Sequence, residues 1–184
     1  GLKRGDYVPE TSYKIINNFQ GSANGQFSFA EKDGGKFFVK AFIKPKYPGD
    51  IISGKLREEK IKRSTAFELQ HEKLLEIFRE NFHEDGQIIY PVDFIRHHCT
   101  YMQFSPYVET YSKDTKSISS ESLEKKLLLL RTLTNAISLL HDHKVVHSDL
   151  KPDNILVKET TSKVLTAKII DFDGSYISGD PHPK

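Results

Sequence analysis

Three side chains that suit phosphoryl-transfer chemistry stand within one short segment. Asp149, Lys151 and Asn154 belong to His147-Ser148-Asp149-Leu150-Lys151-Pro152-Asp153-Asn154, which runs into the apolar Ile155-Leu156-Val157. A later apolar run ends in Asp171-Phe172-Asp173-Gly174. Carboxylate and amide oxygens are the ligands that Mg²⁺ prefers, and a further carboxylate can orient an acceptor hydroxyl. The spacing therefore indicates a site for phosphoryl transfer from a metal-bound nucleotide.

The elements around these residues must bring them together. Leucines at 123, 127 and 130, with Thr134 and Ile137, recur at helical spacing and predict a helix over 121–143, with Ser120 able to cap it. A short strand at Val145-Val146, a polar loop over 147–154 and strands at 155–157 and 164–170 follow. This helix, loop and strand order places the polar residues at the ends of regular elements.

The first half of the chain is predicted to be rich in strands. The Asp33-Gly34 pair between two apolar runs is a strong hairpin signal. Prolines and glycines over 44–54 predict a loop, and the next segment, 55–82, predicts a long helix. The expected strands cover residues 13–19, 27–30, 36–42, 88–95 and 99–104. The order suggests two lobes joined by a linker.

The segment over 147–154 resembles the catalytic loop of protein kinases, and Asp171-Phe172-Asp173 resembles their Asp-Phe-Gly motif. The resemblance implies an α+β, protein-kinase-like fold with an antiparallel β-rich N-lobe and the start of a mainly helical C-lobe. The N-lobe would span 1–104, with a five-stranded sheet and one main helix over about 55–82. Residues 105–119 would form the hinge and linker, and 120–184 the first part of the C-lobe.

The resemblance also implies roles for individual residues. Asp149 and Lys151 would be catalytic: Asp149 would orient the acceptor hydroxyl, and Lys151 would neutralise charge on the transferred phosphoryl group. Asn154 and Asp171 would hold Mg²⁺, and the nucleotide would be ATP. Lys151 followed by Pro152 is similar to the serine/threonine-directed form of the loop.

The same resemblance implies a nucleotide site in the first half of the chain. Lys40, in an otherwise apolar strand, would contact the phosphates. Gly21 and Gly25 stand where the family has a glycine-rich loop, although an ordinary hairpin turn explains two glycines equally well. Phe104 belongs to the hinge over which adenine would lie, and Leu156 would lie under it.

The partner of Lys40 is expected to be a glutamate on the helix. Glu72 is the first choice and Glu68 the second. In the family, apolar residues follow that glutamate after three and four positions, and here the leucines at 74–75 would place it at His71. Spacing alone leaves the choice open.

Four departures from the family pattern stand out. Ser148 replaces the arginine that normally forms a charged hydrogen-bonded pair with a phosphorylated residue of the activation loop. Activity is therefore expected to be independent of such phosphorylation. Asp173 stands in the place of a glycine. Phe38 replaces a small residue next to adenine and would narrow the pocket. The chain ends at Lys184, inside the activation segment, so the fragment is expected to have weak activity or none.

Composition bounds the class of protein. The chain has 184 residues, 37% hydrophobic and 28% charged, with a net charge of +2. This balance fits a globular protein and gives no reason to expect nucleic acid or membrane as a partner. The one cysteine, Cys99, excludes an intrachain disulfide, which fits a cytoplasmic location. No apolar run approaches the length of a membrane-spanning helix, and no signal peptide is expected.

Three functions are compatible with these residues. The first is Mg²⁺- and ATP-dependent phosphorylation of serine or threonine in proteins. The second is a kinase-fold binding module with little or no catalysis, and the third is a small-molecule kinase of the same fold. The apolar face of the helix over 121–143 would, if uncovered, associate with another chain or with the rest of the C-lobe.

Overall fold

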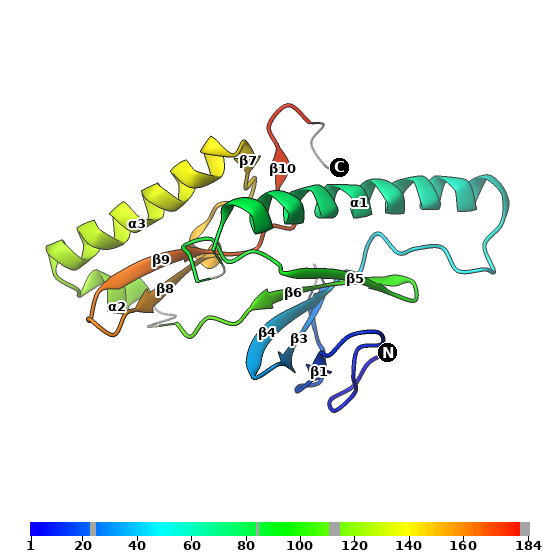
Figure 1. Ribbon diagram of the computed structural model, residues 1–184, viewed down its shortest axis with the longest axis horizontal. Helices are drawn as coiled ribbons and strands as arrows, with labels where there is room; N and C mark the ends of the chain where they lie inside the picture. The colour runs from blue at the N-terminus through cyan, green and yellow to red at the C-terminus, as the bar shows by residue number, and fades with distance from the viewer. Residues whose placement is uncertain (23–24, 84, 111–114, 181–184) are drawn as a thin grey trace. The chain divides into compact units, whose positions relative to one another are not determined.

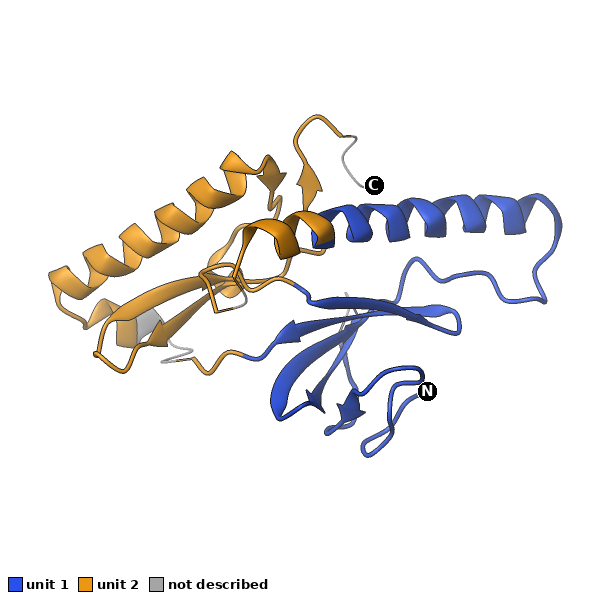
Figure 2. Ribbon diagram, viewed as in Figure 1, with its two compact units in different colours: residues 1–75, 91–107 blue, residues 76–90, 108–184 orange. Residues whose placement is uncertain are grey.

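A computed structural model describes residues 1–22, 25–83, 85–110 and 115–180. The described part forms two compact units, coloured separately in Figure 2. Unit 1 comprises Gly1–Leu75 and Pro91–Tyr107, and unit 2 comprises Glu76–Tyr90 and Val108–Lys184. The order of helices and strands confirms the expected α+β class (Figure 1). Within the described segments, no helix is both long enough and apolar enough to cross a membrane.

Unit 1 is built on an antiparallel sheet with six strands among the described residues. The strand order is β1-β3-β4-β6-β5, with β2 also paired to β3. Asp33 and Gly34 connect β3 to β4, both with positive φ (50° and 78°), as the hairpin signal predicts. The strands are β1 (Lys14–Ile15), β2 (Gln20–Ser22), β3 (Gly25–Lys32), β4 (Gly35–Ala41), β5 (Asp93–His97) and β6 (Thr100–Pro106).

One face of this sheet is covered by the N-terminal segment. Val39 and Phe104 are opposite each other across β4 and β6, and both are fully buried. The ring of Tyr13 stacks on Phe104 with centroids 4.1 Å apart. The Tyr13 hydroxyl donates to Asp93 at 2.6 Å. The core on this face comprises Val8, Tyr13, Ile15, Ala30, Val39, Ala41, Met102 and Phe104.

The other face of the sheet carries the first part of the long helix α1 (Gly54–Asn81). Side chains alternate between faces along a strand, so Lys40 and Phe42 point away from the core that holds Val39. The ring of Phe67 on α1 packs against Phe42 and Tyr101, with centroids 5.1 Å and 5.3 Å away. These aromatic contacts hold the helix on the face of the sheet that also bears Lys40.

Unit 2 contains helix α3 (Leu123–Asp142), a hairpin of β8 (Ile155–Glu159) and β9 (Leu165–Ile169), and the short helix α2 (Thr115–Ser119). Strands β7 (Val145–Val146) and β10 (Tyr176–Ile177) pair with each other. Helix α3 lies along β9 (Figure 1), and the Ala167 amide donates to the Thr132 hydroxyl at 2.9 Å. The N-cap of α3 is Ser122, two residues after the expected Ser120.

Several expected boundaries differ from those observed. The strand expected over 88–95 is found only at Asp93–His97, because Ile88 and Ile89 instead pair with Ile169 of unit 2. The sheet has six strands rather than five because β2, at Gln20–Ser22, also pairs with β3 and was not among the expected strands. The units also divide the chain inside α1, whereas the expected division followed residue 104. Part of the expected linker, 111–114, lies outside the described residues.

Candidate functional site

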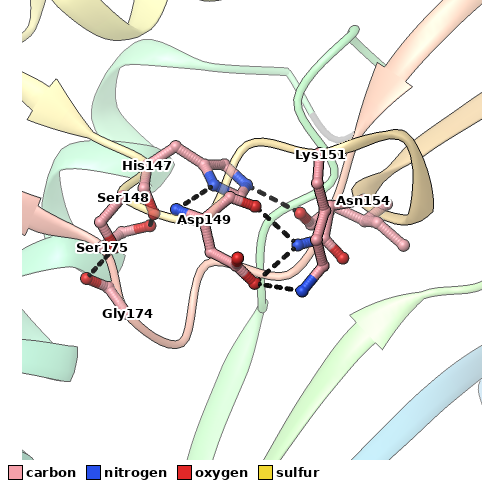
Figure 3. A network of polar contacts seen from close by, with 8 residues as sticks. His147, Ser148, Asp149, Lys151, Asn154, Gly174 and Ser175 are labelled. Atoms are coloured by element: carbon pink, nitrogen blue, oxygen red, sulfur yellow. Dashed lines mark hydrogen bonds and ion pairs between the residues drawn. The ribbon is translucent and has the colours of Figure 1, made fainter.

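The residues with the expected catalytic roles contact one another in unit 2. The Lys151 ammonium donates to the Asp149 carboxylate at 2.7 Å. The Asn154 amide donates to the backbone carbonyl of Asp149 at 2.8 Å and to its carboxylate at 3.1 Å. Figure 3 shows this network, in which one carboxylate receives hydrogen bonds from both side chains. The three residues singled out by spacing are therefore brought together by the fold.

Lys151 and Asp149 each stabilise the charged form of the other. The hydrogen bond from Lys151 is the main reason why the pKa of Asp149 lies below its usual value, and Asn154 adds to the effect. The same hydrogen bond raises the pKa of Lys151, with smaller contributions from Asp171 and Asp153. Hydrogen bonds to a carboxylate favour its charged form. Asp149 is thus held as an exposed carboxylate able to accept a hydrogen bond from a hydroxyl.

A short 3₁₀ turn over Pro152–Asn154 places the amide of Asn154. Proline is suited to the start of such a turn, because it lacks the N–H that would have no partner there. Asn154 is buried, and its backbone carbonyl accepts a hydrogen bond from the Ile170 amide at 3.0 Å. That contact places the turn beside the residue that precedes Asp171.

Asp171 has a left-handed backbone conformation, with φ of 65°. Such a conformation is uncommon for a residue with a side chain, and it persists where the surroundings hold it. His147 provides one such contact, because its Nε2 lies 2.9 Å from the Ile170 carbonyl. The Asp149 amide donates to Nδ1 of the same ring at 3.4 Å, so Nε2 carries the proton and donates.

The donor set around Asp171 suits a hard cation. Asn154 supplies an amide oxygen and Asp171 a carboxylate, which are oxygen donors of the kind that Mg²⁺ takes, usually with waters and substrate phosphates completing its shell. Because the Asn154 nitrogen already donates to Asp149, its oxygen is the atom left for a cation. The residues therefore fit Mg²⁺, which would supply charge neutralisation for phosphate oxygens when bound.

The expected nucleotide residues of unit 1 lie around Lys40 on β4. Lys40 is half-buried and faces Phe27 on β3 and Gln103 on β6. A Cβ added at Gly25 would lie 3.0 Å from the Ala41 carbonyl and 3.8 Å from Cε of Lys40. Only glycine allows this close approach of β3 to the lysine strand. Gly21 has open space around it, so packing gives no reason for a glycine there.

The helix presents His71 and Glu68 to the sheet, whereas Glu72 points away from it. Glu72 is exposed, and Glu68 accepts a hydrogen bond from the Tyr101 hydroxyl at 2.7 Å and an ion pair from Arg96 at 3.4 Å. His71 is buried and stacks on Phe94 with centroids 4.5 Å apart. The pairing of Lys40 with Glu72 stays a prediction, as does the alternative pairing with Glu68.

The environment of His71 disfavours its charged form. Burial lowers its pKa to about 4, although the hydrogen bond between Nδ1 and the Phe67 carbonyl acts in the opposite direction. Because Nδ1 must donate to that carbonyl, Nε2 is the unprotonated nitrogen. Among the described residues, Nε2 is buried without a hydrogen-bond partner. His71 is therefore a neutral imidazole inside an aromatic cluster.

Three phenyl rings lie beside Lys40 on the same face of the sheet. Phe38 stacks on Phe27 with centroids 5.9 Å apart and meets Phe29 edge-on at the same distance. The ring expected to narrow an adenine pocket thus belongs to an aromatic row. Phe104, in contrast, is buried in the core on the opposite face, so its side chain is not presented to a ligand beside Lys40.

Two further residues of unit 2 belong to this description, one expected from the sequence and one that the sequence did not single out. Leu156, which had been expected to lie under adenine, is half-buried on β8. Ser175 is fully buried and donates to the His147 carbonyl at 3.2 Å, a contact for which the sequence holds no signal. His71, in unit 1, was already marked in the sequence by the leucines at 74–75, which place it where the family has the glutamate partner of the lysine.

Comparison with known proteins agrees with the geometry of this site. The family described as "Protein kinase domain" matches residues 27–181. The chain is 26% identical over 165 residues to myosin light chain kinase 2, skeletal/cardiac muscle, of Bos taurus, covering 87% of this chain and 26% of that protein. It is 31% identical over 106 residues to serine/threonine-protein kinase atg1 of Dictyostelium discoideum, covering 57% and 14%.

A third relative is the probable serine/threonine-protein kinase zyg-1 of Caenorhabditis elegans. It is 24% identical over 159 residues, covering 83% of this chain and 21% of that protein. The chain thus spans about a quarter or less of the length of these three relatives. The family match covers most of the chain and includes both the Lys40 strand and the Asp149 network. The chain belongs to the protein kinase domain family.

Proposed function

We propose that this chain binds Mg²⁺ and ATP and supports transfer of the γ-phosphate to serine or threonine hydroxyls of proteins. The observation that carries the proposal is the network of Asp149, Lys151 and Asn154, assembled next to the backbone of Asp171. Phosphoryl transfer depends on positioning and charge stabilisation more than on a strong base. An ionised carboxylate beside an ammonium and two metal-binding groups supplies those two requirements.

In this proposal each residue has one role. Asp149 accepts a hydrogen bond from the acceptor hydroxyl, and Lys151 neutralises the transferred group. Asn154 and Asp171 hold the metal, and Lys40 contacts the phosphates. The names of the relatives favour serine or threonine in a protein as the acceptor, as does Lys151-Pro152. The cytoplasmic location expected from the single cysteine is also part of the proposal.

Stabilisation of the chain by ATP and Mg²⁺ tests this function. A ligand at one hundred times its Kd stabilises a protein by about 2.7 kcal/mol, which raises the Tm of a chain of this size by roughly 5–10 °C. We expect such a rise with both components together and a smaller one with ATP alone. Lys40→Ala should reduce the rise, whereas Lys36→Ala, on the same face of β4, should not. A parent chain with no rise would contradict the proposal.

A binding module with little catalysis is the second candidate. Two observations favour it: the aromatic row that includes Phe38, and the neutral His71 at the place where a glutamate was expected. It would be supported if ATP binds but Mg²⁺ makes no difference. A small-molecule kinase of the same fold would be supported by phosphorylation of small alcohols and of no protein.

Phe38→Ala is expected to increase the affinity for ATP about tenfold. The larger ring occupies space beside Lys40 that a small residue would leave open, and relief of overpacking is typically worth 1–3 kcal/mol. Calorimetric titration of ATP into both proteins measures the change. Phe29→Ala removes the same ring from the neighbouring strand and is the control. Weaker binding by Phe38→Ala would mean that the base stacks on Phe38, contrary to this prediction.

The exposed face of α3 is the proposed association surface. Leu123, Leu127 and Leu130 are 72%, 56% and 55% exposed. Apolar side chains gathered on one helix at this exposure favour contact with another protein surface. Sedimentation velocity over a range of protein concentrations tests whether a second copy of the chain binds to this face of α3.

A further inference from the structure

Ser148 connects the catalytic loop to the segment that follows Asp171. Its Oγ donates to the Gly174 carbonyl at 2.7 Å, a contact drawn in Figure 3. Ser148 has φ of 63°, a conformation that few residues other than glycine adopt without a compensating contact. A Cβ added at Gly174 would lie 2.9 Å from this Oγ. The two segments are therefore in close contact at this point, and a side chain at 174 would displace the Ser148 hydroxyl.

A second hydroxyl donates in the opposite direction, from the segment after Asp171 to the catalytic loop. Ser175, fully buried, donates from its Oγ to the His147 carbonyl at 3.2 Å. The catalytic loop and the metal-binding segment thus each contribute one hydroxyl and one carbonyl. The His147 ring adds a third connection by donating to the Ile170 carbonyl at 2.9 Å. These contacts hold the backbone on both sides of Asp171, at residue 170 and at residues 174–175.

We propose that Ser148 is a positioning residue that fixes the orientation of Asp171 toward the metal through its hydrogen bond to Gly174. This inference rests on the proposed function, because it concerns the metal role of Asp171. The serine hydroxyl is neutral, and its hydrogen bond is made within the chain as it stands. The segment is therefore held in place without the charged pair that a phosphorylated residue and an arginine would form.

Two substitutions separate the hydrogen bond from the backbone conformation. Ser148→Gly removes the hydroxyl and relieves the positive φ, whereas Ser148→Ala removes the hydroxyl and keeps the strain. Ser162→Gly, at an exposed turn of unit 2, is the matched control. If the hydroxyl positions the segment, both Ser148 variants need more Mg²⁺ for the same stabilisation by ATP. This holds for Ser148→Gly even though glycine adopts the positive φ without strain.

The first measurement is amide hydrogen exchange without nucleotide. We expect exchange over residues 171–176 to be about fivefold faster in Ser148→Gly than in the parent, the factor expected for loss of one ordinary hydrogen bond. The second is the Mg²⁺ concentration that gives half of the ATP-dependent Tm rise. We expect it to increase about fivefold in both Ser148 variants, with unchanged binding of ATP in the absence of metal.

Unchanged exchange in Ser148→Gly would overturn the inference. Faster exchange with an unchanged Mg²⁺ requirement would also overturn it, because the hydroxyl would then order the segment without positioning Asp171. A parent that gains no stability from Mg²⁺ and ATP contradicts the proposed function instead. In that protein, faster exchange in Ser148→Gly would still support the role of the hydroxyl in holding the segment.

Discussion

Lowering the pH from 7 to 4 is expected to reduce the free energy of unfolding by about 3 kcal/mol through His71 alone. Burial lowers the pKa of His71 from 6.5 to about 4 in the folded chain. Between these two values the unfolded chain binds a proton that the folded chain does not, so unfolding becomes easier as the pH falls. Each pKa unit corresponds to about 1.4 kcal/mol, and the loss begins near pH 6.5.

Urea denaturation at several pH values, followed by circular dichroism, measures this dependence. Carboxylates also titrate in the lower part of the range, so the contribution of His71 is the difference between the parent and His71→Phe. The phenyl ring can keep the stacking on Phe94, and it removes the buried nitrogen that has no partner among the described residues. We expect His71→Phe to lose stability less steeply between pH 6.5 and 4.

His83→Gln provides the control, because His83 is exposed and has no buried ring to desolvate. It should follow the curve of the parent. If His71→Phe and the parent lose stability in parallel between pH 6.5 and 4, then His71 is not held neutral by burial. The aromatic cluster would in that case admit water or a counter-charge.

Elements with strong local signals were predictable from the sequence. The Asp33-Gly34 turn, the strand after it and the helix expected over 55–82 are present, the helix as Gly54–Asn81. The helix expected over 121–143 is found at Leu123–Asp142. Each rests on turn residues or on helical periodicity within the segment itself. The catalytic-loop residues share this property, because Asp149, Lys151 and Asn154 are close in the chain.

Features that depend on distant partners were not predictable. The apolar run at 88–90 was expected to be part of a strand, yet it is buried against Ile169, and a short apolar run alone cannot reveal such a partner. Similarly, the acidic residue nearest to Lys40 depends on how α1 is rotated on the sheet. That rotation is set by the packing of Phe67 on Phe42 and of His71 on Phe94.

Asp171→Asn is expected to abolish the part of the ATP-dependent stabilisation that requires Mg²⁺, a loss of up to about 3 kcal/mol at saturating ligand. The substitution keeps the size of the side chain and removes its negative charge, which a divalent cation needs more than a neutral oxygen. The folded chain should tolerate the change, because asparagine accepts the left-handed conformation seen at this position. Thermal unfolding with ATP, with and without Mg²⁺, measures the loss.

Asp153→Asn is the matched control for this charge. Asp153 is exposed on the same 3₁₀ turn as Asn154 and contributes, like Asp171, to the raised pKa of Lys151. A general effect of negative charge near Lys151 would therefore appear in both variants. A specific metal site would appear only in Asp171→Asn. If both variants lose the Mg²⁺ effect equally, the cation is attracted by the local field rather than held by Asp171, and the assignment of Asp171 as a ligand is wrong.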